Sequence, residues 1–538
     1  GLQDIPTVSI SLDKDDWAGA TNGIYNHSGS RGFAWERPCS AEYIPAPGTT
    51  GQDWQIDCGI RVQGGASRNS GSSPKHSLSL RFRESYGAGK LRRKVFPDLD
   101  IDEFNVLAFR AGYNNSWIHR DAGQRSRASM IRDQWARDAM VDMGQGHGGH
   151  GIYVHLYING LYWGVHNLCE RQDAAHYATH NGKDEELIDA RNGSEFTDGN
   201  SSAWNRMIST VNSGNWEAIQ QILDVDNYID YQIVNRYGAN QDLKSNGNWR
   251  AAGGGPNDEP WQVYCWDTER TLESPGASNQ PLDPMTIRNT LNGLPEYRLR
   301  FADRVQKHFF NGGALTPAQC AARWMDRAGE IDLAIIAESA RWGDHRQSSA
   351  YSRDIHWITE QNRLLTQYFP GRSNTVLGFF RSSGLYPSTD APAFSVHGGQ
   401  IDPTDTVSLS VSSGTIYYTL DATDPRLPAS GGGTGTVLLD EGDLATAFIP
   451  NTDIGTSWRN TVFDDSSWLS GTTGVGYERT PADYQNLIGL DVGAMANVNT
   501  SVYIRVPFTI PDQTTLDGIA SLTLNMKYDD GFVAYLNG

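Results

Sequence analysis

Residues 157–164 read Tyr-Ile-Asn-Gly-Leu-Tyr-Trp-Gly and lie inside a longer apolar segment at 152–168. Asn-Gly is a preferred pair for two-residue β-hairpin turns, because both turn residues adopt a positive φ. The segment therefore predicts two antiparallel strands joined at this pair. Further upstream, residues 8–12 and 77–82 alternate apolar and polar side chains, as half-buried strands do. The start of the chain is thus expected to be rich in β-strands.

In the second part of the chain the apolar spacing becomes that of helices. A first helix is already expected at residues 129–143, before Gly144, a residue type that commonly ends helices. From about residue 201 onward, helical spacing dominates at 204–211, 216–223, 228–237, 296–310, 317–333 and 352–369. A β-rich lobe (about 1–175) followed by a helical lobe (about 176–386) is the outline of a two-lobed α+β domain.

The length and the charge of the chain limit its functions. At 538 residues it is too long for one hydrophobic core, and its net charge of −19 argues against nucleic acid as a partner. The stretch 61–94 reverses this sign, with Glu84 as its single acid. A solvated surface is the more common use of such a stretch, and an anion site is the alternative. No apolar run approaches the roughly 18 residues of a membrane span, so no span is expected.

Near residue 386 the composition changes, and all-β sandwich modules are expected behind the two-lobed domain. Residues 391–430 contain short alternating runs at 407–411 and 415–420. Three glycines at 431–433 are typical of a flexible linker, and residues 437–538 are again rich in predicted strands. The last module is expected to be truncated, without its final strands.

Neither the cysteines nor the closely spaced histidines predict a metal site. The five cysteines are scattered and show no paired ligand spacing, although Cys39 and Cys58 are candidates for a disulfide in an oxidising compartment. His147 and His150 are three residues apart, but the glycines around them provide no rigid scaffold. A structural metal ion is therefore not expected.

The polar segment 240–249 and the strand at 263–267 contain the candidate catalytic residues. Phosphoryl transfer needs an acid beside the acceptor hydroxyl, and a second acid with an amide oxygen that holds Mg²⁺ on the phosphates. Asp242, Asp267 and Asn248 supply these three groups. Two structural uses stay open, because loop acids more often close a turn, as Asp242 would, or cap a helix, as Asp267 would.

The first lobe contains a candidate phosphate-binding segment. Gly64 and Gly65 form a glycine-rich turn, and Lys75 opens the strand that follows. Glycine backbone can approach phosphates closely, and an ammonium group neutralises them. Because such a lysine needs an acid to orient it, we expect an ion pair between Lys75 and Glu170. The alternative is an ordinary surface salt bridge, worth about 0–1 kcal/mol.

Taken in order along the chain, these residues resemble the CotH kinase family. The hairpin string at 157–164 is the most specific match, and the resemblance covers about residues 5–385. The matching positions are Arg61, Gly64-Gly65, Ser67-Arg68, Lys75, Arg132-Asp133, the hairpin string, Glu170-Arg171, Asn240-Gln241-Asp242, Asn248-Trp249 and Trp266-Asp267.

The resemblance implies an atypical protein-kinase-like fold that binds ATP with Mg²⁺ and phosphorylates serine side chains of a protein. By position in the motifs, Asp242 is the catalytic acid, and Asp267 and Asn248 are the metal ligands. The loop has one residue more than the family pattern, so Asn246 is an alternative ligand, although Trp249 favours Asn248. The implied nucleotide-binding residues are Lys75, Glu170, Arg61, Arg68 and Arg132.

The tail carries two further resemblances. Residues 398–426 resemble the small C-terminal β-sandwich domain of chitobiases. The usual Asp-Gly turn of that domain is Asp421-Ala422 here. Residues 456–538 resemble a galactose-binding-like jelly roll, whose aromatic side chains stack on sugar rings. Together they imply a secreted or cell-surface bacterial protein, with a glycan as a candidate partner beside the protein substrate.

Two other functions compete with a phosphotransferase. A non-catalytic extracellular scaffold is one, because ATP is scarce outside cells, but Lys75, Glu170, Asp242 and Asp267 are all intact. A glycosidase is the other, and it requires two carboxyl groups about 5–10 Å apart across a sugar cleft. The sequence identifies no such pair, so a glycosidase ranks last.

Overall fold

The computed structural model describes most of the chain. The described residues are 1–49, 52–243, 247–278, 286–402, 404–420, 425, 437–452, 454–479, 484–517, 524, 526 and 531–537, without the side chains at positions 514 and 517. They belong to two compact units, Gly1–Ile416 and Tyr417–Gly538. None of the described helices combines the length and the apolar character that crossing a membrane requires.

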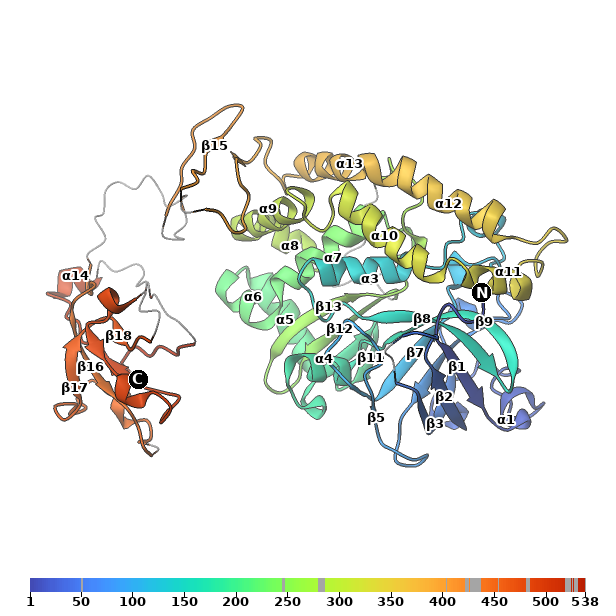
Figure 1. The fold of residues 1–538 in the computed structure, drawn as a ribbon, viewed down its shortest axis with the longest axis horizontal. Coiled ribbons are helices and arrows are strands. Elements are labelled where there is room, and N and C mark those ends of the chain that lie inside the picture. Colours follow the sequence, from blue (N-terminus) through green and yellow to red (C-terminus); the bar gives the residue numbers. More distant parts are fainter. Residues whose placement is uncertain are drawn as a thin grey trace. The chain divides into compact units, whose positions relative to one another are not determined.

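Seven strands of the first unit form a closed barrel (Figure 1). Their order is β1-β2-β3-β4-β7-β9-β8, and β1 closes the barrel by pairing with β8 in parallel. Alternate side chains fill the interior, among them Val8, Ile10, Leu78 and Leu80. The strands are β1 (Thr7–Ser11), β2 (Arg37–Ile44), β3 (Trp54–Gln63), β4 (Ser77–Arg81), β7 (Val106–Arg110), β8 (Gly151–Ile158) and β9 (Leu161–Glu170).

The predicted hairpin is confirmed as β8 and β9. Asn159 and Gly160 between them have φ angles of 50° and 78°, the positive values that the Asn-Gly pair predicts. Cys39 and Cys58 face each other across β2 and β3 as free thiols, with their Sγ atoms 3.6 Å apart. Smaller elements decorate the barrel: α1 (Lys14–Ala18), β5 (Leu91–Arg92), β6 (Glu103–Phe104) and α2 (Ala122–Arg125).

Most of the larger helices of the first unit (Figure 1) contribute to one large core, whereas α4 packs in a separate small cluster with Ala190, Ala252 and Tyr264. α3 and α7 lie at its centre, where they pack against each other and against β13, while α10 contacts α3 and α9 contacts α7. α11 packs against β9 and so joins the helices to the barrel. The helices are α3 (Arg132–Asp142), α4 (Ala174–Asn181), α5 (Ser202–Ser213), α6 (Trp216–Ile222), α7 (Val225–Gly238), α8 (Arg288–Gly293), α9 (Pro295–Phe309), α10 (Pro317–Ile331), α11 (Ala334–Trp342), α12 (Ile358–Arg363) and α13 (Phe369–Ser382).

A four-stranded sheet also lies among the helices, where the sequence predicts a helical lobe. Its order is β11-β10-β12-β13. Two of its strands are short, and every residue of β12 is buried, so its sequence shows no alternation of apolar and polar side chains. The strands are β10 (Asp189–Asn192), β11 (Glu195–Asp198), β12 (Trp249–Gly254) and β13 (Glu259–Cys265).

The helix predicted to end at Phe369 continues to Ser382 as α13. Pro370 lies in the first turn of α13, where its missing N–H group is not needed. A π-helical turn over Leu364–Tyr368 precedes it, so the chain passes through Pro370 without leaving the helical region. Pro370 is therefore compatible with a helix that continues beyond the predicted end at residue 369.

The tail is poorer in strands than predicted. After the last helix in the chain, β14 (Ala393–Phe394) pairs with β15 (Leu409–Ser410). The strand expected at 415–420 is not observed, since the described residues 411–420 contain no strand. Residues 421–424 and 426–436 lie outside the described part. The second unit contains β16 (Leu444–Phe448), β17 (Leu469–Thr472), β18 (Val475–Gly476), β19 (Leu490–Asp491), β20 (Tyr503–Arg505) and α14 (Gln513–Asp517). The chitobiase-like and jelly-roll assignments stay predictions.

Candidate active site

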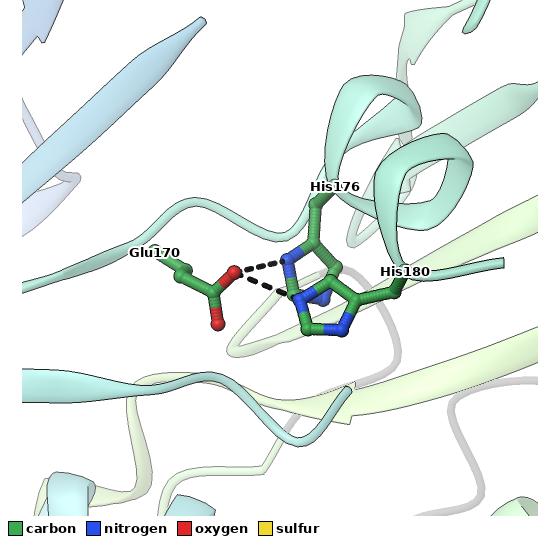
Figure 2. A group of neighbouring side chains, drawn as sticks. All are labelled: Glu170, His176 and His180. Carbon is green, nitrogen blue, oxygen red and sulfur yellow. Dashed lines mark hydrogen bonds and ion pairs between the residues drawn. The ribbon is translucent and has the colours of Figure 1, made fainter. Parts of the chain in front are cut away.

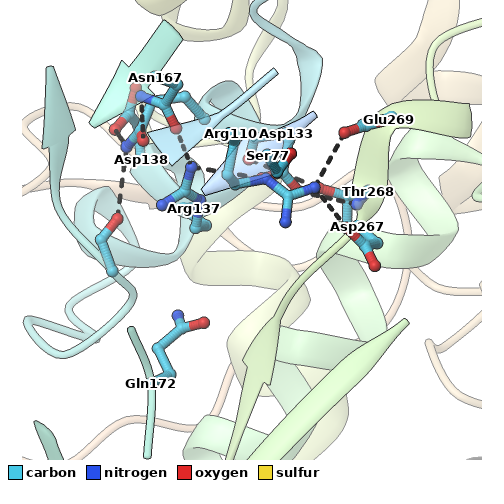
Figure 3. Close-up of polar contacts among 12 residues, drawn as sticks. Ser77, Arg110, Asp133, Arg137, Asp138, Asn167, Gln172, Asp267, Thr268 and Glu269 are labelled. Atoms are coloured by element: carbon cyan, nitrogen blue, oxygen red, sulfur yellow. Dashed lines mark hydrogen bonds and ion pairs between the residues drawn. The ribbon is translucent and has the colours of Figure 1, made fainter. Parts of the chain in front are cut away.

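The outer face of the barrel is polar where β7 ends, and Arg110 is its central residue (Figure 3). Because side chains alternate along a strand, Leu107 and Phe109 fill the barrel, while Ala108 and Arg110 point outward. The outer face packs against Trp266, the first residue after β13. Arg110 is 7% exposed, and its guanidinium lies 4.4 Å from the centre of the Trp266 ring.

Three carboxyl groups surround Arg110. Its Nε atom lies 3.0 Å from Asp133 Oδ2, and its Nη2 atom donates to Glu269 Oε1 at 2.9 Å and to Asp267. Burial lowers the pKa of Arg110, but the three carboxylates outweigh burial and hold it well above the ordinary value. Burial also raises the pKa of Glu269 to about 7, against the attraction of Arg110, so burial favours the protonated form of this acid.

Asp133 and Asp267 differ in how far they are fixed. Asp133 is buried, and its Oδ1 atom accepts hydrogen bonds from the Thr268 N–H group (2.8 Å) and hydroxyl (2.9 Å). Asp267 has a φ of +58° directly before a 3₁₀ turn, Thr268–Arg270, and makes no capping hydrogen bond to it. Its side chain is 38% exposed and contacts Arg110. Asp267 is therefore not the helix cap that the sequence left open.

The loop that contains Asp242 lies beside the Asp267 turn. The Gln241 N–H group donates to the Arg270 carbonyl at 2.8 Å. The pKa of Arg270 is raised, chiefly by its hydrogen bond to Glu273 and in part by the negative charge of Asp242, so Asp242 lies near this turn.

Asn248 reaches the same edge of the sheet. It directly precedes β12, whose first residue, Trp249, pairs with Cys265 at the end of β13. Antiparallel pairing therefore places Asn248 and Asp267 at one end of the β12–β13 ladder. The side-chain amide of Asn248 donates to the Asp242 carbonyl at 2.6 Å. Asn248 therefore contacts the Asp242 backbone and lies at the same ladder end as Asp267, while the alternative ligand Asn246 lies outside the described residues.

A group of half-buried and buried arginines lies beside this edge, and we call it the arginine cluster. It consists of Arg61, Arg81, Arg171 and Arg250. Burial, followed by repulsion from Arg171, lowers the pKa of Arg81 and of Arg250 to about 9 each. In the described part of the chain, Glu36 and Asp173 are the acids that form ion pairs with the cluster.

Arg250 carries the least compensated charge of the cluster. It is 3% exposed and forms no ion pair with any described residue. Its Nη1 atom reaches the Gln172 carbonyl only at 3.4 Å, and its Nε atom has no described hydrogen-bond partner. Its guanidinium stacks on Trp266 at 4.3 Å from the ring centre, and the charge of Asp267 acts on it. A buried cation of this kind is stabilised by an anion from outside the chain.

The ion pair expected between Lys75 and Glu170 is wrong. Lys75 is completely buried, and its Nζ atom contacts Glu338 Oε1 at 2.7 Å and donates to the Val165 carbonyl at 2.6 Å. The other carboxylate oxygen of Glu338 accepts from the Val165 N–H group at 2.7 Å. The sequence analysis did not find Glu338, because it lies 263 positions after Lys75 on α11.

The remaining predicted nucleotide-binding residues make internal contacts. Arg68 donates to the carbonyls of Gly64 and Ser28 at 2.8 Å each, and so holds the glycine-rich turn. Arg132 is buried in an ion pair with Glu360 at 2.6 Å, which joins α3 to α12. Arg61 belongs to the arginine cluster, with its Nε atom 2.6 Å from Glu36. Glu170 contacts histidines on α4 and not a lysine.

Sequence reasoning missed Arg110, Glu269, Arg250 and Arg81 as residues of this site. Asp133 and Arg171 were found only as matching positions, not as functional candidates. Two signals were available. Glu269 follows Asp267 in the same Trp-Asp-Thr-Glu string, and Arg110 ends an otherwise apolar strand at Val106–Phe109. An arginine at such a position needs carboxylate partners when the strand is buried.

Comparison with known families gives one match. A family model described as "CotH kinase protein" matches residues 60–364, which is more than half of the chain and includes every residue of the candidate site. A comparison with curated proteins found no match.

Proposed function

This chain belongs to the CotH kinase protein family, and on that premise we propose that it transfers the γ-phosphate of ATP to serine side chains of a protein, with Mg²⁺. Family membership supports a kinase-like phosphotransferase in general terms. The dependence on ATP and Mg²⁺ and the serine acceptor are proposals that rest on the site.

The observation that carries the proposal is the half-exposed carboxylate of Asp267 beside the uncompensated charge of Arg250. Mg²⁺ prefers carboxylate and amide oxygens, and Asp267 and Asn248 offer both at one end of the β12–β13 ladder. Behind them, Arg110 holds Asp267 in place from its own buried position. A metal-bound triphosphate would bring the anions that the arginine cluster lacks.

Each residue then has a distinct task. Asp267 and Asn248 hold the metal ion, and Asp242 orients the acceptor hydroxyl and accepts its proton. Arg250, Arg81 and Arg171 neutralise the phosphates, a task that the sequence assigned to Lys75. Catalysis of this kind consists mostly of positioning and charge neutralisation. Arg110 is a positioning residue, because it acts through Asp267.

The test is transfer of labelled γ-phosphate from ATP to a serine-containing peptide library, with and without Mg²⁺. Asp242→Asn should abolish transfer but keep ATP binding, and Asp267→Ala should weaken Mg²⁺-dependent ATP binding as well. Asp354→Asn is the matched control, because Asp354 is an exposed acid on another segment. Full transfer by Asp242→Asn and Asp267→Ala would refute the assignment.

A non-catalytic protein with a kinase-like domain is the second candidate. The closed contact between Lys75 and Glu338 favours it, because a buried lysine of this kind binds no phosphate. Calorimetry with ATP and Mg²⁺ separates the two candidates, since a scaffold would give no heat of binding. We further propose, from the tail resemblances, that the protein acts outside the cell and that residues 437–538 bind a glycan.

A further inference from the structure

Three side chains with metal-binding atoms converge where β9 ends and α4 begins (Figure 2). They are Glu170, His176 and His180, and their ligand atoms all lie within 4.8 Å of one another. Glu170 Oε1 is 2.8 Å from His180 Nε2 and 3.3 Å from His176 Nδ1. The proposed phosphotransferase mechanism uses none of these three residues.

Local sequence explains why they meet. His176 and His180 are four residues apart on α4 and therefore lie on one face of the helix. The helix begins directly after Asp173, whose side chain accepts a hydrogen bond from the His176 N–H group at 3.4 Å. Glu170 is the last residue of β9, so three residues separate it from α4. Strand and helix thus bring all three ligands together over a short stretch of chain.

The hydrogen bond of His176 determines which of its nitrogens carries a proton. Its Nε2 atom lies 3.1 Å from the His147 carbonyl oxygen, which can only accept, so Nε2 is the protonated nitrogen. In a neutral imidazole, Nδ1 then carries a lone pair. This buried Nδ1 atom has no hydrogen-bond partner in the described chain, although it faces the Glu170 carboxylate. Two acceptors that face each other need either a proton or a metal cation between them.

The distances from Glu170 to the two histidines are close to the ligand spacing around a small divalent ion, and all three ligand atoms lie within 4.8 Å of one another. With bonds of about 2.0–2.1 Å, tetrahedral Zn²⁺ separates its ligand atoms by about 3.3 Å. The distance between Glu170 and His176 already has this value, and the distance between Glu170 and His180 has to open by about 0.5 Å. A rotation of one side chain is sufficient for such a change.

The surrounding contacts are those that metal ligands need. A ligating histidine usually donates its second N–H group to a carbonyl or carboxylate, as His176 does to His147. Ligating carboxylates are themselves hydrogen-bonded, and Glu170 Oε2 accepts from the His150 N–H group at 2.8 Å. A solvent-connected recess, lined by Glu103, Asn105, Arg171 and Thr179 together with the three ligands, gives an entry path.

We propose that Glu170, His176 and His180 form a binding site for one Zn²⁺ ion, with water as the fourth ligand. Two imidazoles and one carboxylate suit Zn²⁺, whereas Mg²⁺ prefers oxygen ligands only. The ion would fasten α4 to the end of β9, next to Arg171 of the arginine cluster. It also gives Glu170 a role in place of the ion pair with Lys75.

The first test measures zinc in the full chain, purified without a polyhistidine tag and stripped with a chelator. Titration with Zn²⁺ against a coloured chelator, together with elemental analysis, should give one ion per chain. His176→Gln and His180→Gln should each lower the affinity at least tenfold. His397→Gln is the matched control and should bind like wild type, because His397 is exposed and remote in sequence. Absence of zinc in wild type, or unchanged affinity in both ligand variants, would overturn the proposal.

A second measurement does not depend on how the variants fold. X-ray absorption at the zinc edge of the loaded wild-type chain should show two imidazole ligands and two oxygen ligands. Any other ligand set places the ion elsewhere and refutes the site. If wild type binds no zinc, His176 and Glu170 instead form a proton-mediated pair. Neither readout involves phosphate transfer, so this proposal and the phosphotransferase proposal can fail separately.

Discussion

Lys75, two residues before β4, and Arg110, the last residue of β7, are both buried cations, but their surroundings differ. Lys75 has one carboxylate partner, Glu338, and three hydrogen bonds join this pair to the backbone of Val165 and to each other. Arg110 faces three acids, one of which, Asp267, is partly exposed to solvent. Arg250 feels the charges of Asp173 and Asp267 but forms no ion pair with any described residue.

The difference separates a structural contact from a candidate active site. In a buried ion pair whose charges and hydrogen bonds are all satisfied within the protein, no polar group is left to bind a ligand. A cluster that leaves one carboxylate exposed and one guanidinium unpaired keeps free interactions for a ligand, and active sites do this at the expense of stability. Mutations in the two regions should therefore separate loss of stability from loss of binding.

The largest effect on stability is expected at the buried ion pair between Lys75 and Glu338. Lys75→Met leaves Glu338 buried without a countercharge, and we expect a loss of about 3–5 kcal/mol in the free energy of unfolding. Urea unfolding monitored by tryptophan fluorescence measures it. Combining Lys75→Met with Glu338→Gln should restore part of this loss, because the uncompensated charge is removed. A stable Lys75→Met variant that binds no ATP would break the comparison and return Lys75 to the phosphate site.

The next effect is the dependence of stability on pH that arises from Asp133, a carboxylate partner of Arg110. Burial raises the pKa of Asp133, but Arg110, Arg137 and Thr268 outweigh it, so the native pKa lies below the ordinary value. Asp133 therefore contributes stability above its unfolded pKa of about 3.9, and this contribution is lost as the pH falls through its native pKa.

Asp133→Asn tests this sign directly. At neutral pH the variant should be less stable than wild type by roughly 1.5–3 kcal/mol, because charged hydrogen bonds are lost. As the pH falls, the stability curves of the two proteins should converge, since Asp133 in wild type becomes protonated. Urea unfolding from pH 7 downward provides the curves. If the difference in unfolding free energy between the two proteins stays constant with pH, the loss of stability comes from packing and not from the charge of Asp133.

The sequence predicts those parts of the fold and the site that are determined by residues close together in the chain. The hairpin, the strands β1 and β4 and most helices follow from turn residues and apolar spacing within a few residues. The placement of Asp242, Asn248 and Asp267 at one edge also follows from their neighbourhood, because helix, loop and hairpin are consecutive in the chain.

The partners of the cations could not be predicted in the same way. Glu338 lies 263 positions from Lys75, and Asp267 lies 157 positions from Arg110. Nothing in the local sequence distinguishes Glu338 from other helical acids, so the nearer Glu170 was chosen. Glu170 itself has local partners, His176 and His180, and their spacing of four residues on one helix was the available signal for them.

A smaller effect, on binding and not on folding, is expected at Arg250. Because Arg250 is buried without an ion pair among the described residues, Arg250→Met should leave the free energy of unfolding unchanged or raise it. The affinity for ATP with Mg²⁺ should fall about tenfold, the value of one charged hydrogen bond. Calorimetry and urea unfolding on the same preparation measure both. A strongly destabilised variant would place Arg250 with Lys75 among the structural contacts.

The smallest effect should come from Arg83, which shares Glu36 with Arg61 but is 40% exposed. An exposed ion pair is screened by water and salt, so Arg83→Met should change the free energy of unfolding by less than about 1 kcal/mol. Its ATP affinity should match wild type, which makes this variant, from the basic stretch 61–94, the control for Arg250→Met on β12. Charge alone would affect both variants equally; a difference between them shows that burial without a partner, and not basic composition, makes an arginine part of the binding site. Equal losses of ATP affinity in Arg83→Met and Arg250→Met would show that the basic stretch 61–94 attracts ATP by its overall charge. The distinction between paired and unpaired buried cations would then have no bearing on binding.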